Sequence, residues 1–519
     1  MTGDVRRIVV VGGGTAGWLS ACRIAAAADP LARPPISVTL VESPDVPTIG
    51  VGEGTWPTMR GTLAKIGISE TEFLCAADGA FKQGSRFDGW RTGGEGDRYY
   101  HPFTAPAEMS PHDLVALWRQ TERPFAEVAS AQPHVCAHDL APRHRTMPDY
   151  AGALNYAYHL DAGKFAALLR RTATERLGVS HVSDHVVGVE AAEDGDIAGI
   201  VTRQSGVIRG DLFLDCTGHA ALLIGGHANV PLVDRTDVLF NDRALAVQVP
   251  VEPGSPIAAQ TNATAHAAGW IWDIGLPSRR GIGCVYASAF ASDQTAEQTL
   301  RGYLRQAMPG TDPGGLPIRR LAFRSAHRER FWHRNCLAIG LSAGFLEPLE
   351  ASAIVLVELS LDALLDGFPA DRSAMDLHAR RFNALFRYRW DRIVDFLKLH
   401  YVLSSRKEPY WRAHREQATI PERLQELLAL WRTQPPTFAD LPHAHEVFPA
   451  ASYQYVLYGM GALPPPALPV GSGRLDAGAA SLNQIEQRAR TFAASLPTNR
   501  TYLDALHASE TASERTLHV

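Results

Sequence analysis

A glycine-rich turn directly after a short apolar run constrains the fold of this chain more than any other feature. Ile8–Val11 has the pattern of a buried strand, and a GxGxxG sequence at Gly12, Gly14 and Gly17 follows it. Gly12 allows a tight turn, Gly14 lets the backbone approach a pyrophosphate, and Gly17 lets the next helix pack close to the strand. The N-terminus of that helix offers positive dipole to phosphates. The pattern therefore indicates a Rossmann-type β-α-β unit that binds a dinucleotide.

The residues after this loop fit the same unit. Trp18–Ala28 is Ala-rich and helical, Ile36–Val41 is a second strand pattern, and Glu42 follows it. A carboxylate at the end of the second strand binds ribose hydroxyls in such units. The alternative, a glycine-rich turn beside a surface glutamate, stays open.

The chain carries this fingerprint only once. Gly281-x-Gly283 and Gly471-x-Gly473 both lack the third glycine, which a separate Rossmann domain for NAD would need. We therefore expect one tightly bound FAD, and transient use of NADPH without a second fingerprint stays open.

Strand-like and helical runs alternate over the first part of the chain, which predicts an α/β (α+β) fold. Strands are predicted at His185–Val189, Leu212–Asp215, Ala244–Val251 and Cys336–Ile339, and a helix at Ala162–Arg176. From about Ser373 apolar residues recur at helical spacing, over Phe382–Tyr401 and Pro421–Arg432. We expect a dinucleotide-binding body over residues 1–370 and a mainly helical region over 371–508, with a loop at Leu463–Gly473. Residues 509–519 are expected to form a frayed polar tail.

Composition argues against several classes of protein. The 519 residues include 50 Lys+Arg and 55 Asp+Glu, a formal charge of −5, which disfavours nucleic-acid binding through bulk charge. No apolar run reaches the roughly 18 residues of a membrane span, and the first apolar run is too short for a signal peptide. Six cysteines lie far apart without a CxxC pair, which fits a reducing compartment. We expect a soluble cytoplasmic protein.

Two tight clusters of possible metal ligands are present, His134-x-Cys136-x-His138 and His443-x-His445. Neither has a completing pair at the spacing of a zinc site. We therefore expect loop histidines and no bound metal.

Four further segments resemble a known family. They are Ile49–Thr55, Gly79–Lys82, Gly269–Ile274 and Gly344–Glu350, supported by Tyr158–Asp161, Asp215–Gly218 and Asp395–Tyr401. From residue 8 to about 461 the chain resembles the flavin-dependent halogenases of the tryptophan-halogenase type. The pair Trp270 and Trp272 is specific to these enzymes among FAD proteins, and the family places it beside the flavin and a tunnel. A plain core role for the two tryptophans is the alternative.

The resemblance implies an FAD-binding body like that of flavin monooxygenases and a helical region that covers the substrate. It also implies that FADH2, delivered by a separate flavin reductase, uses O2 to oxidise halide to hypohalous acid. The acid then passes through a tunnel to a small aromatic substrate. The expected partners are the reductase and this substrate, with no nucleic acid and no membrane, and the chain acts as a monomer or homodimer.

Two residues stand where the family has its catalytic side chains. Lys82 follows the apolar Gly79–Phe81 and could hold hypohalous acid by a hydrogen bond or as a haloamine, whereas a snorkelling helix lysine is the alternative. Glu350, rather than Glu347 of the same motif, could stabilise the positive charge of aromatic substitution and accept the proton. A structural carboxylate paired with an arginine is the alternative for Glu350.

The resemblance also implies contacts with the cofactor and the halide. Cofactor contacts are implied for Gly12, Gly14, Thr15, Ala16, Gly17, Glu42, Gly52, Glu53 and Leu341. Halide binding is implied for Ser352 and Ala353, in a stretch where the family usually has Ser-Thr-Gly after the glutamate. Because this chain lacks that glycine, we expect less conformational freedom there, with consequences for halide geometry and preference.

Aromatic residues define the expected substrate pocket. His101 and Phe103 match the family pair that sandwiches an indole ring. Tyr453 lies in the segment that matches the clamp for the amino-acid end, but Tyr453–Gly461 contains no acid. An ammonium without a partner in a closed pocket is costly. We therefore expect indole or another neutral aromatic in preference to free tryptophan.

Two other functions stay open. An FAD- and NADPH-dependent aromatic hydroxylase would reduce its flavin with NADPH alone, and Trp270 and Trp272 argue against it. A flavoprotein kept as a binding or redox-sensing module would not need both Lys82 and Glu350. Halogenation of an indole-type ring with bromide or chloride is the function that the sequence predicts.

Overall fold

The computed structural model describes residues 3–29, 31, 35–46, 52–106, 109–310, 312–466 and 472–517. Residues 49–51 of the Ile49–Thr55 segment and residues 467–471 of the predicted loop lie outside the described residues. All six cysteines are free thiols. Among the helices that the structure describes, none is both long and apolar enough to cross a membrane.

The chain forms two compact units, each assembled from three segments. Unit 1 comprises Met1–Asp78, Leu160–Arg235 and Arg324–Trp390, and unit 2 comprises Gly79–His159, Thr236–Phe323 and Asp391–Val519. Unit 1 and unit 2 both contain residues from the predicted body over 1–370, so these units follow a different division from the one expected from composition.

The central sheet of unit 1 is built around β1 (Arg7–Val11), the strand that precedes the glycine loop. Its strand order is β20-β21-β12-β1-β2-β8. The other strands are β2 (Ser37–Glu42), β8 (Ser180–Ser183), β12 (Leu212–Asp215), β20 (Trp332–His333) and β21 (Cys336–Ala338). Neighbours are parallel except for β20 with β21. Since a central parallel strand is buried on both faces, β1 is apolar without alternation.

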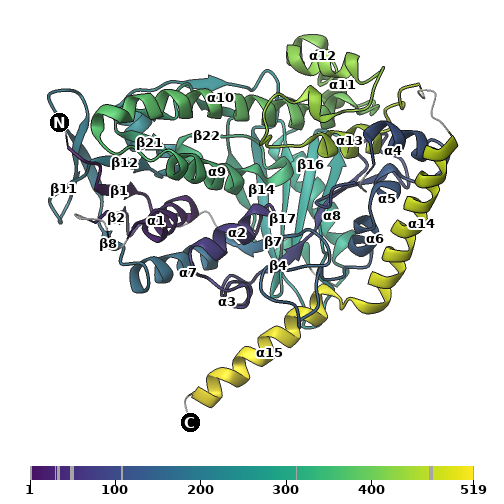
Figure 1. Cartoon of the computed structure of the whole chain (residues 1–519), viewed down its shortest axis with the longest axis horizontal. Helices are drawn as coiled ribbons and strands as arrows, with labels where there is room; N and C mark the ends of the chain where they lie inside the picture. Colours follow the sequence, from purple (N-terminus) through teal and green to yellow (C-terminus); the bar gives the residue numbers. More distant parts are fainter. Residues whose placement is uncertain are drawn as a thin grey trace. The chain divides into compact units, whose positions relative to one another are not determined.

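Helix α1 (Thr15–Ala27) leads from the loop back along this sheet. It packs against β1, β2, α2 (Thr58–Lys65), α7 (Ala162–Glu175) and α9 (Ser352–Asp366), as seen in Figure 1. Eight consecutive residues of α1 are buried, which its alanines and glycine permit because they let neighbouring backbones approach. Helix α3 (Glu70–Ala76) packs against α7, and α10 (Arg372–Val402) begins in unit 1.

Unit 1 also contains two antiparallel three-stranded sheets and several short turns. The sheets consist of β9 (Val186–Ala191), β10 (Ile197–Thr202) and β11 (Val207–Arg209), and of β13 (Leu232–Asp234), β19 (Ala326–Arg328) and β22 (Gly344–Phe345). The short elements are β3 (Gly52–Gly54), η1 (Gly218–Ala220), the π-helical η2 (Leu222–His227), η4 (Gly340–Ser342) and η5 (Leu349–Ala351).

Unit 2 is organised around a seven-stranded sheet with the order β18-β14-β17-β16-β15-β5-β6. Its strands are β5 (Gly84–Asp88), β6 (Arg98–Pro102), β14 (Arg243–Pro250), β15 (Thr261–His266), β16 (Gly269–Gly275), β17 (Arg279–Tyr286) and β18 (Arg319–Ala322). One face packs against α8 (Asp293–Ala307), where Leu300 shares a buried cluster with Val247 and Ile271. Because side chains alternate along a strand, Trp270 and Trp272 lie on the other face.

The remaining elements that the structure describes in unit 2 are one further strand pair, eight helices and three short turns. Strand β4 (Ala80–Lys82) pairs antiparallel with β7 (Ala157–Asp161). The helices are α4 (Pro111–Trp118), α5 (Phe125–Ala129), α6 (Gln132–Ala137), α11 (Pro409–Ala413), α12 (Glu422–Leu430), α13 (Ala450–Gly459), α14 (Ser472–Ser495) and α15 (Asn499–Leu517), with short turns η3 (Pro313–Gly315), η6 (Gln417–Thr419) and η7 (Phe438–Asp440). Helix α13 packs against β6, α14 against α4 and α6, and α15 against β4.

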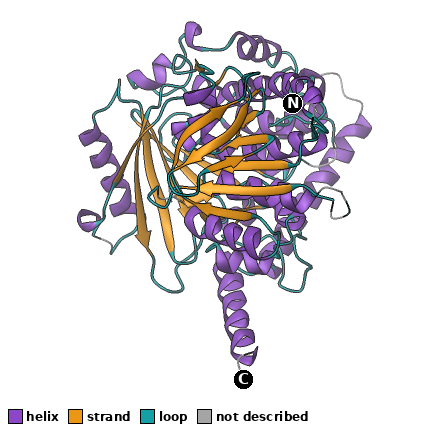
Figure 2. Cartoon of the chain, turned by 90° about the vertical axis from the view of Figure 1, so that its left-hand side faces the viewer, coloured by secondary structure: helices purple, strands orange, loops and turns teal. Residues whose placement is uncertain are grey.

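The α/β class predicted from the sequence is confirmed, and two local predictions are wrong. The predicted loop ends earlier than expected, because α14 begins at Ser472. The tail after Ala508 is helical rather than frayed, because α15 continues to Leu517 (Figure 2). The first turn of α15 is anchored in unit 2, where Asn499 Nδ2 donates to the carbonyl oxygen of Phe81 at 3.1 Å.

Candidate active site

The glycine loop of unit 1 has the geometry of a diphosphate-binding turn. Gly12 has φ +112°, and a Cβ there would lie 2.2 Å from the carbonyl oxygen of Cys216, so only glycine fits. A Cβ on Gly17 would lie 1.8 Å from the carbonyl oxygen of Gly12. A Cβ on Gly14 would meet no atom within 4 Å. Packing therefore requires glycine at positions 12 and 17, whereas Gly14 borders open space.

Helix α1 begins at this open space. Its N-cap is Gly14, which makes no side-chain capping bond, and its first turn contains no acidic residue. Thr15 and Ala16 therefore present backbone N–H groups and the positive end of the helix dipole without a competing anion of the same turn. These residues fit a pyrophosphate.

Glu42 lies over the same loop. A Cβ on Gly13 would come within 1.5 Å of Glu42 Oε2, and Glu42 Oε1 lies 2.9 Å from Nε2 of His181. His181 belongs to β8, the parallel neighbour of β2, and its ring centroid is 5.1 Å from that of Trp18. The carboxylate is thus held beside the loop, in a place suited to ribose hydroxyls. The sequence offered no signal for His181, because only the pairing of β2 with β8 brings it to Glu42.

Asp215 organises a second turn at the same edge of the sheet. Its buried carboxylate accepts the backbone N–H groups of Leu223 and Ile224, each at 2.8 Å. Its carbonyl oxygen accepts the hydroxyl of Ser342, which ties η4 to β12. Leu341, predicted to contact the cofactor, lies half-buried in η4. Two turns of unit 1 are therefore fixed by one buried aspartate.

Glu53 is half-buried in β3, between the buried Gly52 and Gly54. Burial and the nearby Asp161 raise the pKa of its carboxyl to about 7. A carboxyl that is partly neutral near pH 7 can both donate and accept hydrogen bonds.

Glu350 stands in a strained turn of unit 1. Glu350 (φ 63°, ψ 8°) and Ala351 (φ 54°, ψ 47°) both adopt left-handed conformations, which cost about 1–2 kcal/mol for each residue with a side chain. The carbonyl oxygen of Glu350 accepts Nε1–H of Trp56 at 2.8 Å, and the residue is 8 % exposed. Strain of this kind persists only where surrounding contacts fix it, and it is typical of functional sites.

Ser352 and Ala353, the predicted halide residues, begin helix α9. The N-cap Ala351 makes no side-chain capping bond, and the first turn has no acidic residue, so the helix dipole there favours an anion. Ala353 is helical and exposed. The left-handed residues of this stretch are Glu350 and Ala351, and the expected consequences of the missing glycine for halide geometry and preference stay a prediction.

Lys82 ends β4 in unit 2 and is 1 % exposed. Its Nζ atom lies 5.2 Å from the centroid of the Phe103 ring, a cation–π contact. In the register of β4 with β7, Ala80 is opposite His159 and Lys82 is opposite Ala157, so Lys82 and His159 share one face of the pair. Burial and the charge of Lys82 hold the pKa of His159 well below its usual range. Lys82 is thus a buried strand residue, which excludes the alternative of a snorkelling helix lysine.

The backbone of Gln83 and the side chain of Asn155 hold Phe103 beside Lys82. The backbone carbonyl of Gln83 accepts the N–H of Phe103 at 3.1 Å, and the side chain of Asn155 donates to the carbonyl of Phe103 at 2.9 Å. Gln132 Nε2 links these residues, since it lies 2.6 Å from the carbonyl oxygen of Asn155 and 3.3 Å from Oε1 of Gln83. Sequence reasoning missed these three amides because isolated Gln and Asn residues form no motif.

His101 lies on β6 and faces helix α13. Its Nε2 is 3.0 Å from Oγ of Ser452, and its ring centroid is 5.7 Å from that of Phe396. Tyr453, the next residue of α13, also contacts Phe396, with ring centroids 5.0 Å apart. Unit 2 thus brings together the predicted substrate residues of β6 and α13. Ser452 and Phe396 join them without having been predicted.

Trp270 and Trp272 belong to the packed interior of unit 2. Their ring centroids are 6.4 Å apart, and that of Trp270 is 6.1 Å from that of Trp90. The ring of Trp272 lies over Gly283 of β17, where a Cβ would come within 2.1 Å of it. This packing supports a core role, and their predicted contact with flavin and tunnel stays a prediction.

Two carboxylates of unit 2 that could serve a substrate ammonium already have cationic partners. Asp395 lies 2.8 Å from Arg392 and 3.6 Å from Arg423. Burial nevertheless raises the pKa of Asp395 above its usual range. Glu408 pairs with Arg406. A substrate ammonium would have to compete with these arginines.

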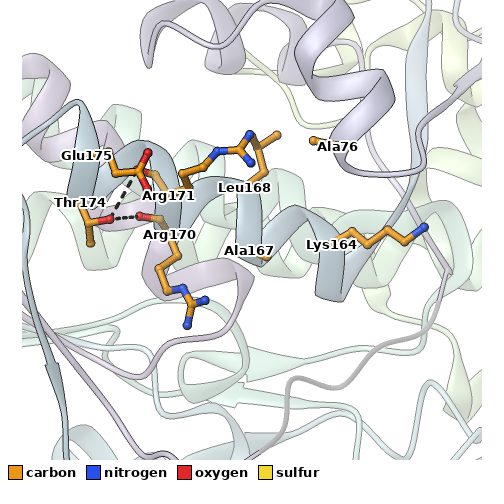
Figure 3. A pocket seen from close by; sticks show the side chains of 8 residues that line it. All are labelled: Ala76, Lys164, Ala167, Leu168, Arg170, Arg171, Thr174 and Glu175. Carbon is orange, nitrogen blue, oxygen red and sulfur yellow. Dashed lines mark hydrogen bonds between the residues drawn. The ribbon is translucent and has the colours of Figure 1, made fainter. Parts of the chain in front are cut away.

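A pocket of unit 1 lies between α3 and α7 and contains none of the predicted site residues (Figure 3). Lys164, Leu168, Arg171 and Glu175 line it at helical spacing, together with Ala76 of α3. This is the arrangement of a solvated helix face. Within the described residues, no group of three or more His, Cys, Asp or Glu side chains could hold a metal ion.

The glycine loop and the carboxylate beside it define unit 1 as a Rossmann-type dinucleotide-binding fold. The model of the tryptophan halogenase family matches residues 7–474. The chain therefore belongs to the tryptophan halogenase family and is a flavin-dependent halogenase.

Relatives and solved structures agree with this assignment. Tryptophan 6-halogenase SttH of Streptomyces toxytricini is 33 % identical over 96 % of this chain and 98 % of that protein. Tryptophan 7-halogenase RebH of Lentzea aerocolonigenes is 35 % identical over 83 % of each chain. The crystal structure of a tryptophan halogenase from Shewanella frigidimarina superimposes with a TM-score of 0.93 at 44 % identity, covering 97 % of this chain and 98 % of that one.

Proposed function

We propose that the protein uses FADH2, O2 and bromide or chloride to halogenate an indole-type ring, with hypohalous acid held by Lys82. The observation that carries this proposal is the burial of Lys82, 1 % exposed, with its Nζ atom 5.2 Å from the Phe103 ring centroid. Burying a cationic side chain is costly unless the site uses or compensates it. The same position carries the lysine expected from the family resemblance.

The residues of unit 1 would hold FAD. Gly12, Gly14 and Gly17 with the first N–H groups of α1 would bind the pyrophosphate, and Glu42 would accept ribose hydroxyls. Glu53 and Leu341 would contact the cofactor from the neighbouring turns. When FAD is bound and reduced, its reaction with O2 would provide the oxidising power that converts halide into hypohalous acid.

Lys82 would orient the oxidant. An ammonium donates hydrogen bonds to the oxygen of hypohalous acid, and a neutral amine can carry the halogen as a haloamine. The apolar surroundings of β4 and the ring of Phe103 keep bulk water from this group. Water exclusion strengthens each of these interactions.

Glu350 would act on the aromatic ring. Attack of the ring on the halogen places positive charge on the ring, and a carboxylate stabilises that charge. The carboxylate then accepts the proton lost from the substituted carbon. Ser352 and Ala353, at the N-terminus of α9, would bind the halide.

A neutral indole-type ring suits the substrate side better than free tryptophan. His101 and Phe103 offer π surfaces for a bicyclic ring. Asp395 is already paired with Arg392 and Arg423, and Tyr453–Gly461 supplies no acid. The relatives named above are halogenases of tryptophan, so the choice between indole and tryptophan is a point for experiment.

The expected partners are a separate flavin reductase, acting transiently or by diffusion, and the small aromatic substrate. The protein would work in the cytoplasm as a monomer or homodimer. One experiment tests the function: the protein, FAD, a flavin reductase, NADH and bromide are incubated with a panel of indoles, and mass spectrometry records halogen addition. A hydroxylated product formed with NADPH and no reductase would instead identify an aromatic hydroxylase.

A further inference from the structure

We propose that Trp56 and Glu358 are positioning residues that fix Glu350 for catalysis by holding its left-handed turn and the helix after it. The proposal rests on the role assigned to Glu350 above. All the contacts that carry it lie within unit 1.

The turn at Glu350 needs external support. Glu350 and Ala351 both have positive φ values of 63° and 54°, and neither is a glycine, so the turn would relax if its neighbours released it. Trp56 supplies one support, because its Nε1–H donates to the carbonyl oxygen of Glu350 at 2.8 Å. This bond fixes the plane of the peptide bond between Glu350 and Ala351.

Glu358 supplies a second support, two turns into α9. It is 2 % exposed. Its Oε1 accepts the hydroxyl of Thr62 at 2.5 Å, and its Oε2 accepts the hydroxyl of Thr58 at 3.0 Å. Both threonines belong to α2, which begins two residues after Trp56.

One short segment therefore holds the turn and the helix at two separate points. Residues 56–62 bind the carbonyl of Glu350 through Trp56 and the carboxyl of Glu358 through the two threonines. Two attachments spaced along α9 resist both translation of the helix and rotation about its axis. A single attachment would leave the Glu350 side chain able to swing.

The charges around Glu358 do not explain its presence as an ordinary ion pair. Arg23 of α1 and Lys65 of α2 face this region, but both bind Asp362, at 2.7 and 3.4 Å. The carboxyl of Glu358 is instead hydrogen-bonded to neutral hydroxyls. Burial raises its pKa to about 7. A buried carboxyl that costs solvation without a bound cation is consistent with a positioning task.

The test uses full-length protein loaded with FAD and supplied by a reductase. Trp56→Phe removes the Nε1–H donor, Thr62→Val removes one hydroxyl, and Glu358→Leu removes the acceptor. We expect each to lower kcat for halogenation by about ten- to a hundredfold, the scale of a misplaced catalytic group, with a small change in KM. Glu358→Gln keeps an oxygen and a nitrogen that can hydrogen-bond to the two threonines, so it should retain most of the wild-type kcat that Glu358→Leu loses. Asp366→Asn, which changes an exposed carboxylate at the end of the same helix, is the matched control and should retain wild-type kcat.

A double-mutant cycle separates positioning from general structural damage. In the Glu350→Gln background, Trp56→Phe and Glu358→Leu should lower kcat no further, because the group that they position is already disabled. Equal losses in the wild-type and Glu350→Gln backgrounds would overturn the proposal. Full activity of Glu350→Gln alone would instead overturn the proposed function.

Discussion

The Nζ atom of Lys82 lies 5.2 Å from the centroid of the Phe103 ring, so a buried cation and a flat aromatic surface are fixed beside each other. Lys82 is held by its place in β4, and Phe103 is held at its N–H and carbonyl groups by Gln83 and Asn155. An aromatic ring has two faces, and an ammonium on one leaves the other available for stacking. The pair can therefore place an oxidant anchor and a substrate ring close together.

Lys82→Ala should abolish halogenation while FAD binding and fold are retained, because the oxidant loses its anchor and the dinucleotide loop is untouched. Product formation by mass spectrometry and FAD content of the purified protein are the measurements. Lys164→Ala, which changes a half-exposed lysine of α7, is the control and should behave as wild type. Normal turnover by Lys82→Ala would refute the proposed role of this lysine.

Glu350→Gln should slow halogenation by about a hundredfold or more, because a neutral amide stabilises a cationic ring poorly and is a weak base. Single-turnover kinetics with preformed FADH2 would separate this loss from flavin reduction. Consumption of FADH2 by O2 should remain at the wild-type rate. A parallel fall in both rates would assign Glu350 to the flavin reaction rather than to the ring.

Substitutions in the glycine loop should separate packing from cofactor binding. Gly12→Ala places a Cβ 2.2 Å from the Cys216 carbonyl oxygen at φ +112° and should lower the free energy of unfolding of the apoprotein by about 2–3 kcal/mol. Gly14→Ala meets no protein atom within 4 Å, so the apoprotein should keep its Tm. The same substitution should weaken FAD binding, measured by fluorescence titration, because the added methyl group lies where the backbone approaches the pyrophosphate. Tight FAD binding by Gly14→Ala would place the pyrophosphate elsewhere.

Indole should be halogenated with a higher kcat/KM than tryptophan under one reductase supply. The ammonium of tryptophan would lack an acid in Tyr453–Gly461, whereas Phe103 and His101 still offer π surfaces to the ring. A loosely clamped indole should react at its most nucleophilic carbon, C3, and NMR would assign the product. A preference for tryptophan, or a single product on the benzo ring, would mean that an acid closes the clamp. Glu446 would then be the first residue to substitute.

The buried carboxyl of Glu358 should make stability depend on pH between about 4.5 and 7. Its pKa is raised from 4.5 to about 7 in the folded chain, so the native state keeps a proton that the unfolded chain releases. The free energy of unfolding should therefore fall as pH rises through this window, by on the order of 3 kcal/mol. Denaturant titrations from pH 4.5 to 8 would measure it. Glu358→Gln cannot ionise and should lose this contribution, whereas the control Asp366→Asn, at an exposed position at the end of α9, should keep it.

The sequence alone determined the local chemistry of the chain. Gly12, Gly14 and Gly17 after an apolar run predicted the β-α-β turn, because the turn, the phosphate approach and the helix packing each require a missing side chain. The structure confirms this unit and gives steric reasons for two of the three glycines. Lys82 and Glu350 were singled out because the contiguous segments that contain them resemble motifs of the family, and their catalytic roles stay predictions.

Only the tertiary structure decided what surrounds these residues. Gln132 reaches Gln83 across 49 positions, and Trp56 reaches Glu350 across 294. Such contacts are set by which strands pair and which helices pack, and a single amide or indole N–H leaves no periodic trace in the sequence. The start of α15 is likewise held at long range, since Asn499 donates to the carbonyl of Phe81, 418 positions away. Local sequence specifies a chemical group, whereas long-range packing specifies the partner that orients it.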